Sequence, residues 1–197
     1  MPPRDRARAA RAIDEFLRAL GHEPAGHPDL GETGARVADA WCGELLDGED
    51  VDVVALLRAE SFVEPTPAHG PGVVALRDLE VSTVCPHHLL PAIGSALVAY
   101  VPGERVTGFG TITRVLDSLA HRLTLQERIS QDVVSALMDG LGARGAACVL
   151  RLQHGCLAAR GPRSHGRIET VATAGSLAPG GDLHGLVAGW LGRGKWS

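Results

Sequence analysis

Two short segments rich in cysteine and histidine, far apart along the chain, most constrain how it can fold. The first reads CPHH at 85–88 and the second reads HGC at 154–156. Cysteine and histidine are ligands that zinc prefers, and a catalytic zinc takes three protein ligands and keeps one position open. A fold in which both segments serve one metal must bring them together. Spacing alone is equally compatible with a buried free cysteine and ordinary histidines.

The spacing within each segment suits a shared metal. Cys85 and His88 lie three residues apart beside a proline, so a tight loop can direct both at one ion. His154 and Cys156 lie two apart, so on a β-strand both would point to one face. With Cys85, His88 and Cys156 as ligands, His87 and His154 would be left for acid–base chemistry, which favours a hydrolytic site. A structural metal would instead take one of these two histidines as a fourth ligand.

Composition and charge exclude several classes of protein. The chain has 197 residues, of which 45% are hydrophobic, and its net charge of −4 argues against a nucleic-acid partner. It contains no run of about 18 apolar residues, so we expect no membrane span. The chain has four cysteines and no visible secretory signal, so we predict a cytoplasmic protein in which the C-x-x-H and H-x-C segments bind metal and the cysteines do not form disulfides.

Changes in composition predict three parts. Residues 1–72 are expected to form an N-terminal helical arm and a linker, which is rich in Pro and Gly at 65–72. Residues 73–177 are expected to form the catalytic domain. Residues 178–197 form a Gly-rich C-terminal tail, of which we expect 183–191 to be ordered.

Hydrophobic periodicity predicts an α+β catalytic domain. Its expected elements are strands at 73–84 and 95–101, helices around 112–119 and 129–141, and strands at 146–153 and 170–174. This order predicts an antiparallel ββααββ sheet with two helices on one face, so the other face needs cover. In the arm, the periodicity predicts helices at 4–20, 33–46 and 51–57.

Several motifs, in the same order along the chain, resemble the GTP cyclohydrolase I family. The longest of these motifs is STVCPHHLLP at 82–91, which resembles the family's zinc loop. Further matches are Gly94, AYVP at 99–102, RL at 122–123, QER at 126–128, HGC at 154–156 and RG at 160–161. The resemblance covers roughly residues 30–177.

The resemblance implies a tunnelling fold and a zinc site. In the family the sheets of several subunits join into an oligomeric barrel, commonly a decamer of two pentamers, with active sites between subunits. The family's zinc ligands match Cys85, His88 and Cys156. Its catalytic histidines match His87 and His154.

The resemblance also implies four substrate contacts. Glu127 matches the carboxylate that holds the guanine edge, with Gln126 beside it, and Arg114 and Arg160 match arginines that contact the triphosphate. A carboxylate can accept two N–H bonds from guanine, so a base without those donors would leave it unpaired. Without the resemblance, Glu127 would be interpreted as a solvated helix residue.

The implied reaction is the zinc-dependent opening of the imidazole ring of GTP at C8, which gives dihydroneopterin triphosphate and formate. Zinc lowers the pKa of bound water to about 7, and iron or manganese could take its place. A histidine must protonate a ring nitrogen as the ring opens, a role that suits His154.

Three departures from the family concern the residues around the site. Pro86 stands where the family has a glutamate that supports the base-binding network. Gly110 and Thr111 stand where the family has a serine and a lysine for the ribose and triphosphate. Loss of a charged hydrogen bond from the lysine would cost about 1.5–3 kcal/mol of binding. Either Arg114, Arg160, Arg163 and Arg167 rebuild a triphosphate pocket, or the substrate is a purine without a triphosphate, for example guanine or 8-oxoguanine.

Two further classes remain open from the sequence. One is a nitrile reductase of deazapurine metabolism, which has a related fold and uses a cysteine nucleophile with a nicotinamide cofactor. The other is a non-catalytic oligomer that binds a purine. A Cys/His/Cys metal shell argues against the first, and histidines beside an open metal position argue against the second.

Overall fold

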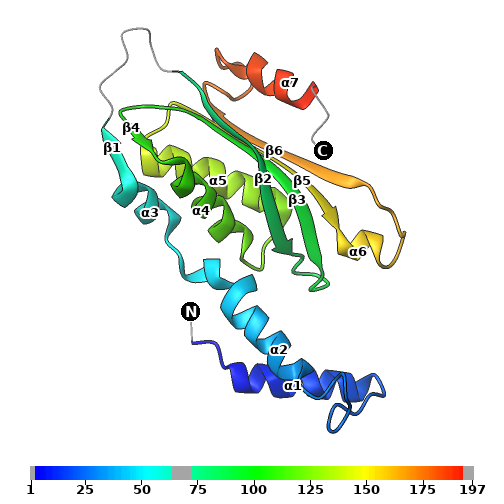
Figure 1. The fold of residues 1–197 in the computed structure, drawn as a ribbon. Helices are drawn as coiled ribbons and strands as arrows, with labels where there is room; N and C mark the ends of the chain where they lie inside the picture. The colour runs from blue at the N-terminus through cyan, green and yellow to red at the C-terminus, as the bar shows by residue number, and fades with distance from the viewer. Residues whose placement is uncertain (1–2, 64–71, 193–197) are drawn as a thin grey trace.

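The computed structural model describes residues 3–63 and 72–192. Its central sheet contains β2 (Val74–Val84), β3 (Pro91–Val101), β5 (Gly145–His154) and β6 (Arg167–Gly175). The strands are antiparallel and lie in the order β2-β3-β5-β6. Helices α4 (Phe109–Ala120) and α5 (Gln126–Leu141) cover one face, and α7 (His184–Gly192) lies over the other (Figure 1). This arrangement confirms the predicted α+β class.

Alternation along the central strands builds a core on each face of the sheet. On β5, Cys148 and Leu150 are fully buried on the side of α4 and α5, where Leu137 is also fully buried. Val149 faces the other side and joins the core beneath α7. Burial of each large apolar side chain stabilises the fold by about 1.5–3 kcal/mol. The sheet is therefore held from both faces.

The far face of the sheet is covered by the chain's own C-terminal segment. Val187 and Trp190 of α7 pack with Leu97 of β3 and Leu177. The guanidinium of Arg77 lies over the Trp190 ring, 5.7 Å from its centroid, at a distance typical of a cation–π contact. The section expected to be ordered, 183–191, therefore forms the helix that covers this face.

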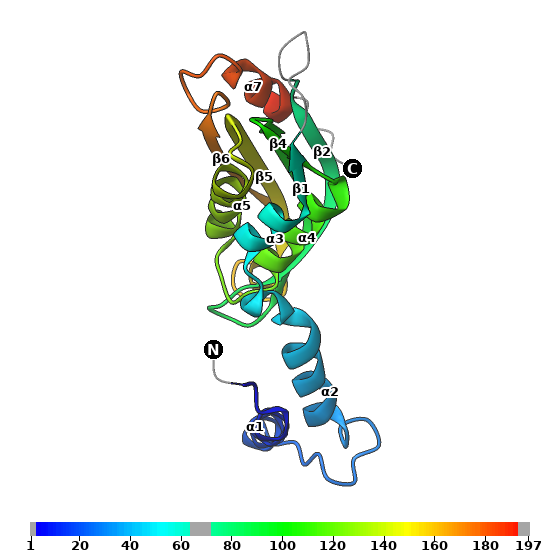
Figure 2. The same ribbon diagram turned by 90° about the vertical axis from the view of Figure 1, so that its left-hand side faces the viewer.

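The N-terminal helices differ in what they contact. Helices α1 (Arg6–Ala19) and α2 (Thr33–Ala40) pack on each other and project from the layered body (Figure 2). Helix α3 (Val53–Glu60) instead packs on α4 and α5, with Leu57 fully buried against Gly140. Apart from Gly72, the linker predicted at 65–72 lies outside the described residues. The division of the chain at residue 72 stays a prediction.

The periodicity did not predict a small second sheet or the start of β3. Strands β1 (Ser61–Val63) and β4 (Arg105–Thr107) pair antiparallel, but three residues are too short to show an alternating pattern. β3 begins at Pro91, before the predicted residue 95. Gly94 interrupts the alternation of apolar side chains at the start of this strand. The position requires glycine, because a Cβ on it would lie 2.0 Å from the carbonyl oxygen of Arg151. Within the described residues, no helix is long and apolar enough to span a membrane.

Candidate active site

A tight loop between β2 and β3 holds the first pair of metal-ligand candidates. The Cys85 amide donates to the carbonyl of Leu90 at 2.9 Å, and the Leu89 amide donates to the carbonyl of Cys85 at 2.9 Å. Leu89 takes a φ of 53°, a left-handed conformation that is uncommon for leucine. The loop brings Cys85 Sγ to 3.7 Å from His88 Nδ1, as the spacing predicted.

The sheet register brings the second segment to the same place. His154 is the last residue of β5 and lies opposite Ala92 of β3. Cys156 follows in the one-turn helix α6 (Gly155–Ala158), not on the strand. The expectation that a strand would direct His154 and Cys156 to one face was therefore wrong, because the strand ends before the cysteine.

Cys85, His88 and Cys156 form a group that could bind a metal. Their ligand atoms lie within 4.8 Å of one another. All four cysteines of the chain lie within the described residues and are free thiols. Burial and the neighbouring Cys85 raise the pKa of the Cys156 thiol. A bound cation would relieve the repulsion between two sulfur anions, so this donor set fits a borderline-soft divalent metal.

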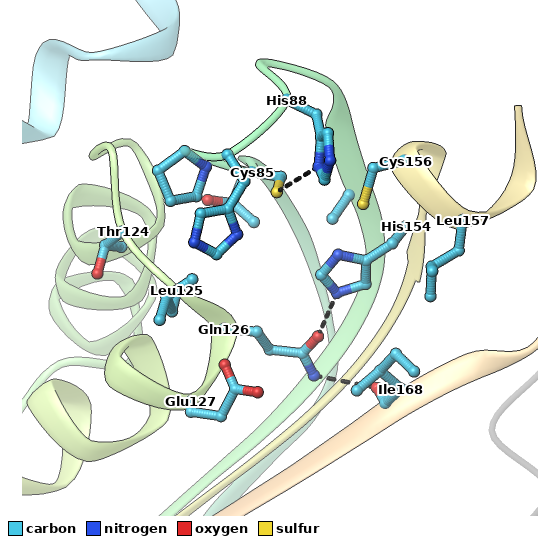
Figure 3. Close-up of a pocket in the computed structure, with 14 residues that line it drawn as sticks. Cys85, His88, Thr124, Leu125, Gln126, Glu127, His154, Cys156, Leu157 and Ile168 are labelled. Carbon is cyan, nitrogen blue, oxygen red and sulfur yellow. Dashed lines mark hydrogen bonds between the residues drawn. The ribbon is translucent and has the colours of Figure 1, made fainter. Parts of the chain in front are cut away.

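A cavity of about 300 Å³ opens beside this group. Its walls come from the loop after β2, the start of α5, the end of β5 and Ile168 of β6 (Figure 3). The lining includes seven of the nine predicted site residues, among them His87, His154, Gln126 and Glu127. Among the described residues that line it, none is lysine or arginine.

Gln126 fixes the orientation of His154. Only 3% of the residue is exposed, and its amide nitrogen donates to the carbonyls of Leu150 (3.2 Å) and Ile168 (3.0 Å). Its amide oxygen must therefore accept from His154 Nε2, which lies 2.7 Å away (Figure 3). Neutral His154 thus carries its proton on Nε2, and its Nδ1 is an acceptor.

Burial lowers the pKa of His154, while the charge of Glu127 opposes that shift. The imidazole is therefore neutral at pH 7. Because His154 is turned to Gln126, the metal-ligand group has three protein members rather than four, the number typical of catalytic sites. The Glu127 side chain is exposed and reaches the same cavity. The residues predicted to act as acid–base, base-binding and metal-binding groups thus line one cavity.

The two predicted phosphate contacts lie outside this cavity. Arg160 is exposed and follows α6, where its charge acts to lower the pKa of Cys156. Arg114 lies on α4 and forms an ion pair with Glu60, the last residue of α3. Thr111 donates to the same Glu60 oxygen at 2.8 Å. The sequence offered no signal for Glu60, since it is remote from every motif.

The fold and the site together define a class of protein. It is an α+β protein whose antiparallel sheet carries α4 and α5 on one face and α7 on the other. At the end of its strands stands a Cys/His/Cys group that could bind a metal, beside a pocket that contains an anchored histidine.

The family model for GTP cyclohydrolase I matches residues 9–183 of the chain. The chain therefore belongs to the GTP cyclohydrolase I family, which confirms the resemblance found in its motifs.

Curated relatives support the same assignment. GTP cyclohydrolase 1 of Leifsonia xyli subsp. xyli is 43% identical, over 91% of this chain and 88% of the relative. GTP cyclohydrolase 1 of Ralstonia nicotianae is 40% identical over 78% and 70%, and that of Corynebacterium glutamicum (strain R) is 36% identical over 85% and 83%. A solved structure of an apo archaeosine synthase QueF-Like aligns with 54% of this chain and 96% of that chain, at 18% identity and a TM-score of 0.42. That likeness is too weak to carry an argument.

Proposed function

We propose that this chain is a zinc-dependent cyclohydrolase that opens the imidazole ring of a guanine-type purine at C8, with GTP as substrate and formate as a product. The observation that carries the proposal is the meeting of the Cys85, His88 and Cys156 group with His154 and Glu127 in one cavity. Relatives named GTP cyclohydrolase 1 over most of the chain's length support the choice of substrate.

The three ligands would hold the zinc. When bound, the zinc supplies a Lewis acid that activates water at neutral pH. Two waters are consumed in the hydrolysis. The first leaves a formamide as one C8–N bond breaks, and the second releases formate.

The surrounding side chains have distinct proposed roles. His154, held through Nε2 by Gln126, takes a proton at Nδ1 from the attacking water and passes it to the purine ring nitrogen that gains one on ring opening. His87, which lines the cavity, is a second acid–base group. Glu127 accepts two N–H bonds from the guanine edge, so that a base lacking them binds poorly. Gln126 acts through His154 as a positioning residue.

The complete site is proposed to require a homo-oligomer. No residue of α4 lines the cavity within the described chain, so Arg114 cannot serve the same substrate unless a second copy supplies it. β2 and β6 are the edge strands of the four-stranded sheet, and such edges favour pairing with another copy. A barrel made of joined sheets, in a decamer of two pentamers, would pair the edge strands and would bring Arg114 of one copy to the site of another. Metal-binding thiols suit the reducing cytoplasm.

A second substrate class is favoured by one observation. The described lining of the cavity offers no cationic side chain of Lys or Arg for a triphosphate, and Gly110 and Thr111 do not supply one either. Guanine, guanosine or 8-oxoguanine would fit the same ring-opening chemistry without a phosphate site.

The test is incubation of the zinc-loaded protein with GTP, guanosine, guanine and 8-oxoguanine, followed by ultraviolet spectroscopy and mass. Conversion of GTP to a pterin that fluoresces after oxidation supports the proposal. Turnover of a smaller purine alone would assign the second class. Stable zinc binding without turnover of any of the four would contradict the proposed activity.

A further inference from the structure

Arg114 and Thr111 form a site with the chemistry of an anion receptor. They lie three residues apart on α4, so one turn of helix brings them to the same face. A guanidinium forms strong charged hydrogen bonds with carboxylates and phosphates, and a hydroxyl near a helix N-terminus adds a donor where negative charge is favoured. Thr111 is the third residue of α4. The pair is therefore suited to a carboxylate or a phosphate.

The receptor already holds an anion that belongs to the chain. One carboxylate oxygen of Glu60 both pairs with Arg114 and accepts from Thr111. Arg114 also accounts for the largest part of the lowering of the Glu60 pKa. The side chains of Arg114 and Glu60 are 56% and 36% exposed, so an external phosphate can reach the pair.

The Glu60 carboxylate is not needed to hold its own segment. A negative charge at the C-terminal end of a helix such as α3 is unfavourable. The backbone there is fixed by other groups: Thr107 Oγ1 donates to the carbonyl of Glu60 at 3.1 Å, and Arg105 donates to the side chain and carbonyl of Ser61 at 2.8 and 2.9 Å. The contacts to α4 are therefore what the carboxylate contributes.

We propose that Glu60 is a specificity-determining residue: it occupies the phosphate position on Thr111 and Arg114, competes with the substrate's phosphate groups, and so reduces the advantage of GTP over purines that lack phosphate. The inference rests on the proposed function, in which Arg114 of one copy faces the substrate of another. With Glu60 ionised, the pair is neutral. Without that charge, Arg114 offers a free positive charge to a phosphate.

The test compares Glu60→Gln with the wild type. Glutamine keeps the size and the hydrogen-bonding oxygen but removes the charge. We expect KM for GTP to fall about tenfold while KM for guanosine stays unchanged, since one charged hydrogen bond is worth about one decade of affinity. The gain should vanish in the Glu60→Gln/Arg114→Ala double variant. Glu104→Gln, which removes an exposed carboxylate between β3 and β4, is the matched control and should leave both KM values unchanged.

Direct binding of inorganic tripolyphosphate, measured by calorimetry, separates this inference from the proposed function. We expect tripolyphosphate to bind Glu60→Gln about tenfold more tightly than the wild type. If no purine is turned over but tripolyphosphate binding responds in this way, the proposed function fails, while the competition of Glu60 with phosphate for Thr111 and Arg114 stands. If tripolyphosphate binding is the same in both proteins, or if GTP and guanosine respond equally, Glu60 is only a structural partner of α4 and the inference is overturned.

Discussion

The N-terminal ends of the two helices on the sheet differ in how their polar groups are satisfied. At the start of α5, Gln126 anchors His154, and Glu127 faces a cavity beside three metal-ligand candidates. At the start of α4, the Glu60 carboxylate binds Thr111 and Arg114. We call the start of α5 the open end, because its polar groups line a cavity. We call the start of α4 the closed end, because the Glu60 carboxylate occupies its polar groups.

This difference separates the groups proposed to take part in the reaction from the groups proposed to recognise a substrate's charge. The metal-ligand group needs a cation to hold both of its sulfurs as thiolates, because two thiolates so close together repel each other. The α4 pair is stable without any ligand. The open end should therefore control whether the reaction occurs, and the closed end should control which purine is preferred.

Removal of a metal ligand should have the largest effect. Cys156→Ala is expected to abolish stoichiometric metal binding and to reduce turnover by at least about 10³-fold, because activation of water depends on the metal. Metal content by mass spectrometry and a turnover assay check this. Cys42→Ala, at a half-buried cysteine in the N-terminal part, is the control and should retain both. Full activity in metal-free Cys156→Ala would show that the open end does not work through a metal.

Release of His154 from its anchor should have the next largest effect. Gln126→Ala is expected to lower kcat about 100-fold while metal content stays intact, since a mispositioned acid–base group loses its catalytic contribution. It should also lower the free energy of unfolding by about 1–3 kcal/mol, because buried carbonyls lose their donor. Gln153→Ala, at an exposed glutamine on β5, is the control. An unchanged kcat with lower stability would reduce Gln126 to a structural role.

At the closed end, the pKa of Glu60 should report the ion pair. It is expected to lie below the ordinary value of 4.5 in the wild type and to rise towards that value in Arg114→Ala. Because the folded pKa is lowered, the pair's stabilisation is fully present above pH 4.5 and is lost as the pH falls through the lowered value. Carboxyl NMR titration measures both values. An identical pKa in the two proteins would mean that this end is not closed by charge.

The smallest effect is expected at Gly110. A Cβ at this position meets nothing within 4 Å, so Gly110→Ser should fold normally and gain about 0.5 kcal/mol or less in free energy of unfolding. KM for GTP should change less than in Glu60→Gln, because Glu60 still holds Arg114. Thermal unfolding and steady-state kinetics check this. A larger gain in GTP affinity from the serine than from Glu60→Gln would place the control of specificity at Gly110.

Motifs with local spacing were the most predictable part of the site. Cys85 and His88 needed only a tight loop, and the strand predicted at 146–153 matches β5 to within one residue at each end. Cys156 was correctly expected to lie near Cys85 and His88. The reason given, that a strand would direct it there, was wrong, since the strand ends at His154 and Cys156 lies in α6.

Contacts between remote segments were not predictable. The Glu60–Arg114 pair joins the end of α3 to α4, and no periodic pattern links two residues that far apart in the chain. The hydrogen bond from His154 to Gln126 depends on where α5 begins relative to β5. Such contacts follow from tertiary packing, so only the structure reveals them.

Ring opening at C8 can be measured with GTP and guanosine labelled with carbon-13 at that atom. The zinc-loaded protein and the Cys156→Ala variant are each incubated with the two compounds, and formate is followed by NMR. We expect labelled formate from at least one compound with the wild type and none from the variant. Retention of the label in both compounds by a wild-type protein with zinc bound would contradict the proposal that this cavity opens the imidazole ring of GTP at C8.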